Sequence, residues 1–234
     1  MNITIEDVND NSPVFSAATV ELIVKEDVKT DLAIYQVHAT DPDDGDNGQI
    51  RYSLLTNPDG VFSLDASSGL VKLNKQLNYE TKTQYTLSVE ARDLGSTQQK
   101  STMTLRIRVE DVNDNAPVFT QTSYSVAVAE ATPVNNKFAQ VSATDADTGN
   151  NAKIMYSMDA NPTFGIFPND GWLYVKRALD REDKQTYTFT VTARDNGTPQ
   201  RTVRVPLTIK VSLNYLLLYL LIIYLLYILI HLLE

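Results

Sequence analysis

Apolar and polar residues alternate along much of the chain, in runs of about eight residues. An alternation with a period of two is typical of a β-strand with one buried face. The apolar members of four such runs are Tyr85, Leu87, Val89 and Ala91; Met103, Leu105, Ile107 and Val109; Tyr187, Phe189, Val191 and Ala193; and Val203, Val205, Leu207, Ile209 and Val211. We therefore predict long strands at these four places.

Shorter strands are predicted near residues 19–24, 33–39 and 50–55, between clusters of Gly, Pro, Asp and Asn. About seven short strands per hundred residues is typical of a Greek-key β-sandwich. Pro206 interrupts the last alternating run, and because proline has no N–H to donate we expect an edge strand or a bulge there. Trp172 is interpreted as core or strand packing, with a binding anchor as the alternative.

The same pattern occurs twice. Residues 6–15 read Glu-Asp-Val-Asn-Asp-Asn-Ser-Pro-Val-Phe, and residues 110–119 repeat this 104 positions later with Ala116 as the only change. After a two-residue deletion the spacing becomes 102. A period near 100 predicts tandem domains. The predicted parts are a linker remnant at 1–11, a repeat at 12–110, a linker at 111–115, a second repeat at 116–212 and an apolar segment at 213–233.

The charge balance limits the possible ligands. The chain has 29 acidic and 20 basic residues, a formal net charge of −9, which argues against a nucleic-acid partner. It has no cysteine, so it forms no disulfide or thiolate metal site. With two histidines and no Gly-x-Ser-x-Gly motif or phosphate loop, an enzyme with a small-molecule substrate is not expected. A cation is the favoured ligand.

Five acidic motifs recur in both copies. They are Glu26 with Glu130, Asp41-Pro-Asp43 with Asp145-Ala-Asp147, Glu80 with Glu182, Asp93 with Asp195, and the acidic segments 7–11 and 111–115. Turn formation alone does not require the glutamates to recur. Calcium binds six to eight oxygens from carboxylates and carbonyls, whereas zinc prefers His and Cys. An EF-hand is excluded, because residues 41–52 carry Asp46 where Gly is required and Tyr52 where Glu is required.

In combination these motifs resemble the cadherin family over about residues 1–212. The resemblance rests on the Asp-x-Asn-Asp-Asn linkers, the following Pro-Val-Phe, the Asp-x-Asp motifs, Leu-Asp-Arg-Glu at 179–182 and the Ala-Arg-Asp triplets. It implies an all-β fold of two tandem seven-stranded Greek-key β-sandwiches, here followed by a C-terminal apolar helix. It also implies calcium-dependent cell adhesion. The linkers are more similar to those of the Fat, Dachsous and protocadherin groups than to those of the short strand-swapping members.

The resemblance implies three calcium ions at the junction of the two repeats. The implied side-chain ligands are Glu26 and Glu80 of the first repeat, Asp111, Asn113 and Asp114 of the linker, and Asp145, Asp147 and Asp195 of the second repeat. Val112, Asn115 and Asn151 would add backbone carbonyls. Asn78 stands where the family usually has Asp, so we predict that the outermost ion binds weakest.

The two ends of the chain carry partial sets of ligands. At the start, Asn9, Asn11, Asp41, Asp43, Asn47 and Asp93 could hold one calcium ion. Asp7 and Asp10 would need a preceding repeat. Glu130, Asp180 and Glu182 would need a following linker, but Leu213-Asn-Tyr-Leu-Leu217 stands at that place.

Electrostatics predicts how calcium would act at the junction. Seven carboxylates converge there, and two unit charges about 5 Å apart repel by roughly 3 kcal/mol at an effective dielectric near 20. Without metal we expect a hinge, and with three divalent ions a stiff rod. Extracellular calcium modules have dissociation constants of about 10⁻⁴ to 10⁻³ M, so the sites would fill outside the cell. We infer a location on the outer face of the cell membrane, with other cadherin ectodomains as partners in cis or trans.

Residues 213–233 carry no charge and could span a hydrocarbon core of about 30 Å as a helix. However, Arg201, Arg204 and Lys210 precede the segment and no basic residue follows it, the reverse of the positive-inside pattern. The segment is therefore interpreted either as a membrane anchor or as translated AT-rich non-coding sequence, a gene-model artefact. The first residues do not resemble a signal peptide, so membrane attachment would come through this segment or through missing sequence.

Two further functions stay open: a passive calcium-stiffened spacer and a sugar-binding sandwich. Glycosylation sequons occur at Asn2-Ile-Thr4 and Asn196-Gly-Thr198, whereas Asn161-Pro-Thr163 is excluded by its proline. The sequons do not decide the function.

Overall fold

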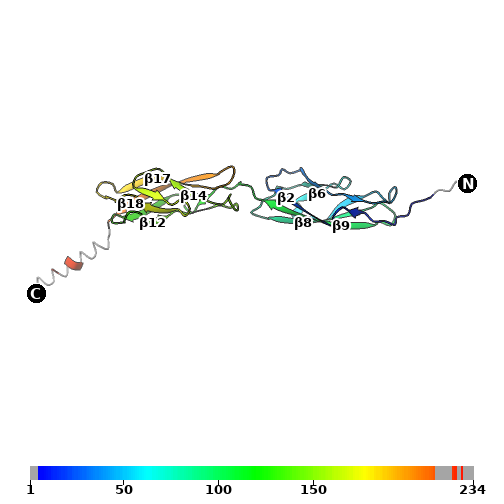
Figure 1. The fold of residues 1–234 in the computed structure, drawn as a ribbon, viewed down its shortest axis with the longest axis horizontal. Helices are drawn as coiled ribbons and strands as arrows, with labels where there is room; N and C mark the ends of the chain where they lie inside the picture. Colours follow the sequence, from blue (N-terminus) through cyan, green and yellow to red (C-terminus); the bar gives the residue numbers. More distant parts are fainter. Residues whose placement is uncertain (1–4, 214–222, 226–227, 229–234) are drawn as a thin grey trace. The chain divides into compact units, whose positions relative to one another are not determined.

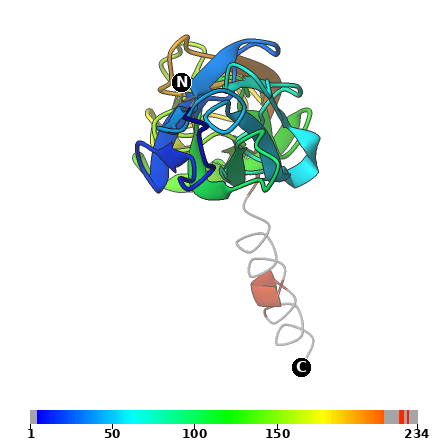
Figure 2. The same cartoon turned by 90° about the vertical axis from the view of Figure 1, so that its right-hand side faces the viewer.

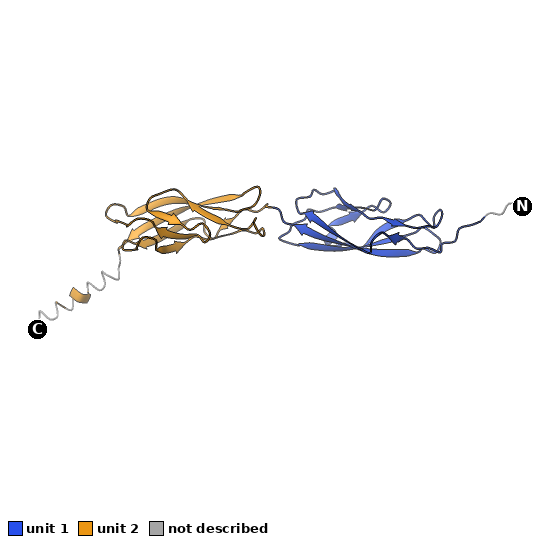
Figure 3. Ribbon diagram, in the orientation of Figure 1, with its two compact units in different colours: residues 1–112 blue, residues 113–234 orange. Residues whose placement is uncertain are grey.

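The computed structural model describes residues 5–213, 223–225 and 228 (Figure 1). It divides into two compact units, residues 1–112 and 113–234 (Figure 3). The division falls inside the segment in which we expected a linker. Each unit is built almost entirely of β-strands, and each has a hydrophobic core of its own.

Unit 1 has nine strand segments among its described residues. They are β1 (Val14–Phe15), β2 (Thr19–Lys25), β3 (Ala33–Gln36), β4 (Ala39–Thr40), β5 (Arg51–Thr56), β6 (Phe62–Leu64), β7 (Leu70–Leu73), β8 (Gln84–Arg92) and β9 (Lys100–Glu110), with a 3₁₀ turn, η1 (Pro58–Gly60), between β5 and β6. One sheet has the order β2-β9-β8-β5, a second has the order β3-β7-β6, and β1 pairs with β4. Figure 2 views this unit from its N-terminal end.

Unit 2 repeats this arrangement. Its strands are β10 (Val118–Phe119), β11 (Tyr124–Ala129), β12 (Lys137–Gln140), β13 (Ala143–Thr144), β14 (Met155–Met158), β15 (Phe164–Ile166), β16 (Trp172–Val175), β17 (Thr186–Arg194) and β18 (Thr202–Ser212). The sheets have the orders β11-β18-β17-β14 and β12-β16-β15, and β10 pairs with β13. When β1 with β2 and β3 with β4 are each counted as one interrupted strand, each unit has the expected seven strands of a β-sandwich.

The alternation in the sequence produces the buried faces. Leu87, Val89 and Ala91 of β8 are completely buried, as are Leu105 and Ile107 of β9. Burial of each of the Leu, Val and Ile side chains among them stabilises the fold by roughly 1.5–3 kcal/mol. The repeated Tyr-Ser pair also has a structural role, because the Tyr hydroxyl accepts a hydrogen bond from a backbone N–H of the neighbouring strand. Tyr52 accepts from Ala39, and Tyr156 from Ala143, both at 2.9 Å.

The expectation for Pro206 was wrong, because β18 lies between β11 and β17 and is not an edge strand. Pro206 pairs with Thr190 of β17, but pairing with β11 begins only at the next residue, Leu207. In unit 1 the residue at this position is Thr104, whose N–H donates to the carbonyl of Ala18. Proline is therefore tolerated because the strand is locally unpaired on one side.

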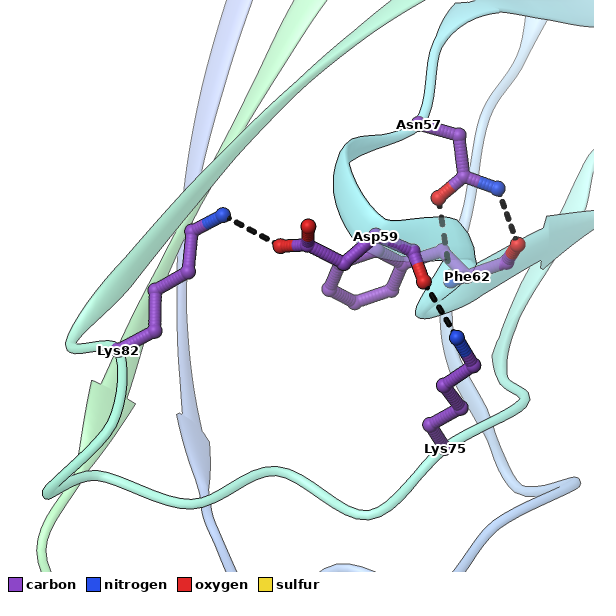
Figure 4. Close-up of polar contacts among 5 residues, drawn as sticks. All are labelled: Asn57, Asp59, Phe62, Lys75 and Lys82. Carbon is purple, nitrogen blue, oxygen red and sulfur yellow. Dashed lines mark hydrogen bonds and ion pairs between the residues drawn. The ribbon is translucent and has the colours of Figure 1, made fainter.

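The two-residue deletion shortens the loop that joins the four-stranded sheet to the three-stranded sheet, between β5 and β6 in unit 1 and between β14 and β15 in unit 2. In unit 1 this loop includes Asp59, which has a left-handed φ of 59° and is held on two sides (Figure 4). The Nζ atom of Lys82 lies 2.7 Å from its carboxylate, and Nζ of Lys75 donates to its carbonyl at 2.6 Å. Asn57 closes the loop through two hydrogen bonds with the backbone of Phe62. In unit 2, Asn161 closes the shorter loop onto Thr163 and Phe164.

Most of the apolar segment 213–233 lies outside the described residues. Residues 223–225 and 228 are helical. In the described part of the chain, no helix has the length and hydropathy that a membrane crossing requires.

Candidate metal centres

Three aspartates are brought together at the start of unit 2. Asp145 and Asp147 follow β13, and Asp195 follows β17. Asp195 is completely buried, and its two carboxylate oxygens accept hydrogen bonds from the backbone N–H groups of Gly197 and Arg201, both at 2.9 Å. A carboxylate has about four lone-pair sites, so these two bonds leave capacity for a cation.

Asn113 is held in place by the loop that follows Asp195. Its Nδ2 donates to the carbonyl of Pro199 at 2.5 Å, and its own carbonyl accepts from Nε of Arg201 at 2.8 Å. The amide is 2% exposed, and its Oδ1 has no donor in the described residues, as is also true of the buried Oδ2 of Asp145. Buried oxygens without a partner cost roughly 1–3 kcal/mol each, and coordination of a cation is one way in which such an oxygen gains a partner.

Electrostatics at this cluster also favours a bound cation. Burial raises the pKa of the Asp145 carboxyl above its ordinary value, and the nearby carboxylates of Asp147 and Asp195 raise it further. A raised carboxyl pKa means that the folded protein disfavours the negative charge. A divalent ion would remove this unfavourable interaction.

Asn115 and Asp147 complete the cluster. The backbone N–H and the Nδ2 of Asn115 both donate to the Asp147 carboxylate, the latter at 2.7 Å. Nδ2 also donates to Asp114, at 2.8 Å. Asn151, from which we expected a backbone carbonyl ligand, lies in a turn where its N–H donates to the carbonyl of Thr148.

Unit 1 has the same cluster at its start. Asp93 is completely buried and accepts hydrogen bonds from the backbone of Gly95 and Gln99, at 3.0 and 2.8 Å. Nδ2 of Asn9 donates to the carbonyl of Thr97, which leaves Oδ1 of Asn9 buried without a donor. The buried Oδ2 of Asp41 also has no donor in the described residues. Each unit therefore buries one asparagine Oδ1 and one aspartate Oδ2 that have no hydrogen-bond donor in the described residues.

The other predicted ligands of this first cluster lie beside it. Asn11 donates to Asp43 from its backbone N–H at 3.1 Å and from Nδ2 at 2.5 Å. Nδ2 of Asn47 donates to Asp7, which also accepts from the backbone of Asp44. Asp7 is thus oriented by residues of unit 1, and the need for a preceding repeat to complete its calcium site stays a prediction.

A second acidic group lies at the far end of unit 1. One carboxylate oxygen from each of Glu26, Glu80 and Asp111 lies within 4.8 Å of the others. Glu26 is 2% exposed and accepts hydrogen bonds from the backbone of Tyr79 and Val112, at 2.6 and 2.9 Å. Glu26 is therefore held in place by the fold rather than loosely placed on the surface.

Asn78 has a structural contact of its own. Its Oδ1 accepts a hydrogen bond from the backbone of Thr81 at 2.7 Å. The oxygen that we expected to reach calcium thus caps a turn. In unit 2, Asp180 caps the equivalent turn at Asp183, at 2.9 Å. The second unit also has the equivalent group, with oxygens of Glu130, Asp180 and Glu182 within 4.8 Å of one another.

Sequence reasoning missed two glycines that position the asparagines. A Cβ atom at Gly197 would lie 2.3 Å from Cγ of Asn113, and one at Gly95 would lie 2.3 Å from Nδ2 of Asn9. Any side chain at either glycine would displace the asparagine beside it. The signal was present, because the two glycines recur at the same spacing as the Ala-Arg-Asp triplets.

With this geometry established, comparisons place the chain among known proteins. The cadherin domain family matches residues 21–110 and 124–212. The Drosophila melanogaster protein dachsous is 41% identical over 227 residues, which cover 90% of this chain and 6% of that protein. Human protocadherin Fat 4 is 40% identical over 212 residues, which cover 89% of this chain and 4% of that protein. Mouse cadherin-23 EC22–24 has a similar crystal structure, with a TM-score of 0.83, 37% identity, and coverage of 87% of this chain and 67% of that chain.

The chain belongs to the cadherin family. Its two units are tandem cadherin repeats, which are non-enzymatic modules of cell-adhesion ectodomains. The expected resemblance to the Fat and Dachsous groups is confirmed by these two relatives. The chain spans only 6% and 4% of the length of these relatives.

Proposed function

We propose that this chain is a calcium-dependent adhesion segment of a cell-surface protein, in which calcium between the repeats restricts their relative motion. The observation that carries the proposal is the pair of buried, donorless oxygens that recurs in both units: Asn9 with Asp41, and Asn113 with Asp145. Neutral packing does not explain such a pair, because each oxygen loses its hydration on folding. A hard cation with oxygen ligands supplies the missing partner.

The ligands of the proposed junction follow from chain connectivity. Asp111 belongs to the carboxylate group with Glu26 and Glu80, and Asp114 follows three residues later at the start of unit 2. Ligands of both repeats are therefore tethered by a very short segment. We propose three calcium ions held by these residues and by Asn113, Asp145, Asp147 and Asp195, with backbone oxygens from the linker.

Charge neutralisation is the proposed mechanism. Seven carboxylates are tethered to one junction, and close pairs repel by roughly 3 kcal/mol at an effective dielectric near 20. Bound calcium, when present, supplies the compensating positive charge. The residues themselves act by orientation: Glu26 is fixed by Tyr79 and Val112, and Asp195 by Gly197 and Arg201.

Location and partners follow from the family. We propose an extracellular position at the plasma membrane, where calcium is abundant enough to fill sites with dissociation constants of about 10⁻⁴ to 10⁻³ M. The proposed partners are other cadherin ectodomains, in cis or in trans. A related solved structure, described as a protocadherin gammaB7 EC3-6 cis-dimer, has a TM-score of 0.81 and 30% identity, and covers 88% of this chain and 52% of that chain.

Bead aggregation tests the adhesive part of the proposal. The full chain is coupled to beads and mixed with about 1 mM calcium or with a chelator. Adhesion predicts aggregates in calcium that disperse when the chelator is added. Beads that stay dispersed in calcium would instead identify a passive spacer. Beads carrying the Asp195→Ala variant are the control for calcium acting through this site.

A further inference from the structure

Three aromatic side chains lie on the outer face of the three-stranded sheet of unit 2. Trp172 and Tyr174 belong to β16, and Phe167 follows β15; all three are half-buried or exposed. In unit 1 the equivalent positions carry Leu70, Lys72 and Asp65. The sandwich therefore folds without aromatic residues at these positions. Because the aromatic residues occur in unit 2 and not in unit 1, they call for an explanation other than the fold.

A lysine covers two of the three rings. Nζ of Lys137 lies 4.9 Å from the ring centroid of Phe167 and 5.5 Å from that of Trp172. The same ammonium group forms an ion pair with Asp170 at 3.1 Å. Cation–π contacts of this kind stabilise local packing. Trp172 is thus explained by strand packing, as the sequence interpretation proposed.

Tyr174 is placed differently, because it lies across a glycine. A Cβ atom at Gly165 would lie 2.3–2.5 Å from Cζ, Cε1 and Oη of Tyr174. The ring therefore occupies the space of a side chain on the neighbouring strand β15, with its centroid 4.6 Å from that of Phe167. In unit 1 the residue equivalent to Gly165 is Ser63, which would block this position.

By crossing Gly165, Tyr174 reaches a hollow of about 250 Å³ bordered by β14 and β15. The apolar part of its lining includes Tyr174, Gly165 and Met158. Polar side chains of several kinds line the same hollow: Ser157, Asp159, Asn161 and Lys176. An aromatic surface with a hydroxyl, a carboxylate, an amide and an ammonium group is thus gathered in a shallow site.

Two of these polar groups have unused hydrogen-bonding capacity. Asp159 accepts the backbone N–H of Thr190 with Oδ2 at 2.6 Å, and its Oδ1 accepts no hydrogen bond from the described residues. Nζ of Lys176 donates to the carbonyl of Asn161 at 2.8 Å, and an ammonium group has three donors. In unit 1 the equivalents of Asp159 and Lys176 are Leu55 and Asn74, so both charges are specific to unit 2.

We propose that this hollow binds one pyranose ring of a glycan. A sugar presents an apolar C–H face, which would lie against Tyr174, and hydroxyl groups, which both donate and accept hydrogen bonds. Asp159 would accept from one hydroxyl, and Lys176 would donate to a neighbouring one. The hollow lies just below the usual range of about 300–1,000 Å³ for small-molecule sites, which suits a single ring. A protein partner would need an interface of roughly 1,000 Å² or more.

The test is a sugar titration of the isotopically labelled full chain followed by NMR. The probes are methyl α-mannopyranoside, methyl β-galactopyranoside and N-acetylglucosamine. At least one probe should bind with a dissociation constant of about 1–10 mM, because a single ring offers few contacts. The shifted signals should include those of Gly165 and Tyr174. If no probe shifts these signals at about 50 mM, well above that range, the proposal is wrong.

Substitutions taken from unit 1 provide matched variants. Tyr174→Lys and Gly165→Ser each introduce the residue that unit 1 carries at the same position, and Gly165→Ser would displace the Tyr174 ring from β15. Each should weaken sugar binding by about tenfold or more, the usual effect of losing an aromatic anchor. Lys72→Ala, at the position in unit 1 equivalent to Tyr174, should leave the sugar affinity unchanged. Equal affinity in Tyr174→Lys and the unmodified chain would overturn the proposal.

Discussion

Arg201 donates a hydrogen bond from Nε to the backbone carbonyl of Asn113, at 2.8 Å. The same contact occurs in unit 1, where Nε2 of Gln99 donates to the carbonyl of Asn9 at 2.9 Å. In both units the contact holds an asparagine whose Oδ1 is buried without a donor. Arg201 and Gln99 therefore each hold a proposed calcium ligand in place, although neither is itself a proposed ligand.

Removing this contact should weaken calcium binding. Arg201→Ala loses one hydrogen bond, worth about 1 kcal/mol, which corresponds to roughly fivefold weaker calcium affinity. Arg201→Gln introduces the residue that unit 1 uses and should stay within about twofold of the unmodified chain. Calorimetric titration with calcium measures both. Equal affinities in all three proteins would show that Asn113 needs no such support.

Removing a charge from the aspartate cluster should have opposite effects with and without calcium. Asp145→Asn relieves the repulsion from Asp147 and Asp195, which together with burial raises the pKa of Asp145. In chelator, the melting temperature should rise by a few degrees. In calcium, the stabilisation by bound metal should be smaller than in the unmodified chain. Thermal unfolding in the two buffers measures both effects.

The control for that experiment is Glu21→Gln. Glu21 is exposed, lies on β2, belongs to neither of the acidic groups described above and forms an ion pair with Arg106, at 3.4 Å. The Glu21→Gln substitution should leave both melting temperatures nearly unchanged, because exposed ion pairs contribute little to stability. A fall in the chelator melting temperature of Asp145→Asn would contradict the proposed repulsion.

Restoring the missing charge at Asn78 should strengthen the weakest calcium site. Asn78→Asp keeps the oxygen that caps the turn at Thr81, as Asp180 does at Asp183 in unit 2. The added charge should improve the affinity of the weakest ion several-fold, because ligand charge tunes calcium affinity. A terbium or calcium titration that resolves the weakest step provides the measurement. An unchanged weakest step would show that residue 78 does not contact the ion.

The Asp59–Lys82 pair gives a prediction about pH. The hydrogen bond and charge of Lys82 hold the pKa of Asp59 below its ordinary value. Its contribution to stability is present above the unfolded-state pKa and is lost as the pH falls through the folded-state pKa. In Lys82→Gln the NMR titration midpoint of Asp59 should move upward. Lys75→Gln should move it less, because Lys75 contacts the Asp59 carbonyl and not the carboxylate.

The sequence predicted the features that rest on periodicity. Alternation located the buried faces of β8 and β9, and recurrence located the acidic clusters, since both patterns are local or repeated at a fixed spacing. The prediction of an edge strand or bulge at Pro206 failed. Whether this position of β18 is paired on both sides depends on where β11 begins, which the local sequence pattern does not indicate. The contact of Tyr174 with Gly165 was also invisible, because it depends on the pairing of β15 with β16.

The central claim is that calcium restricts the motion of one repeat relative to the other. The chain contains no cysteine, so spin labels attach only at introduced positions. Thr86→Cys in unit 1 and Thr188→Cys in unit 2 place labels at equivalent, exposed strand positions. Pulsed EPR of the doubly labelled full chain measures the distribution of label-to-label distances. If calcium restricts the motion, the distribution is narrow in calcium and broadens severalfold in chelator; the same distribution in both buffers would contradict the proposed role of calcium.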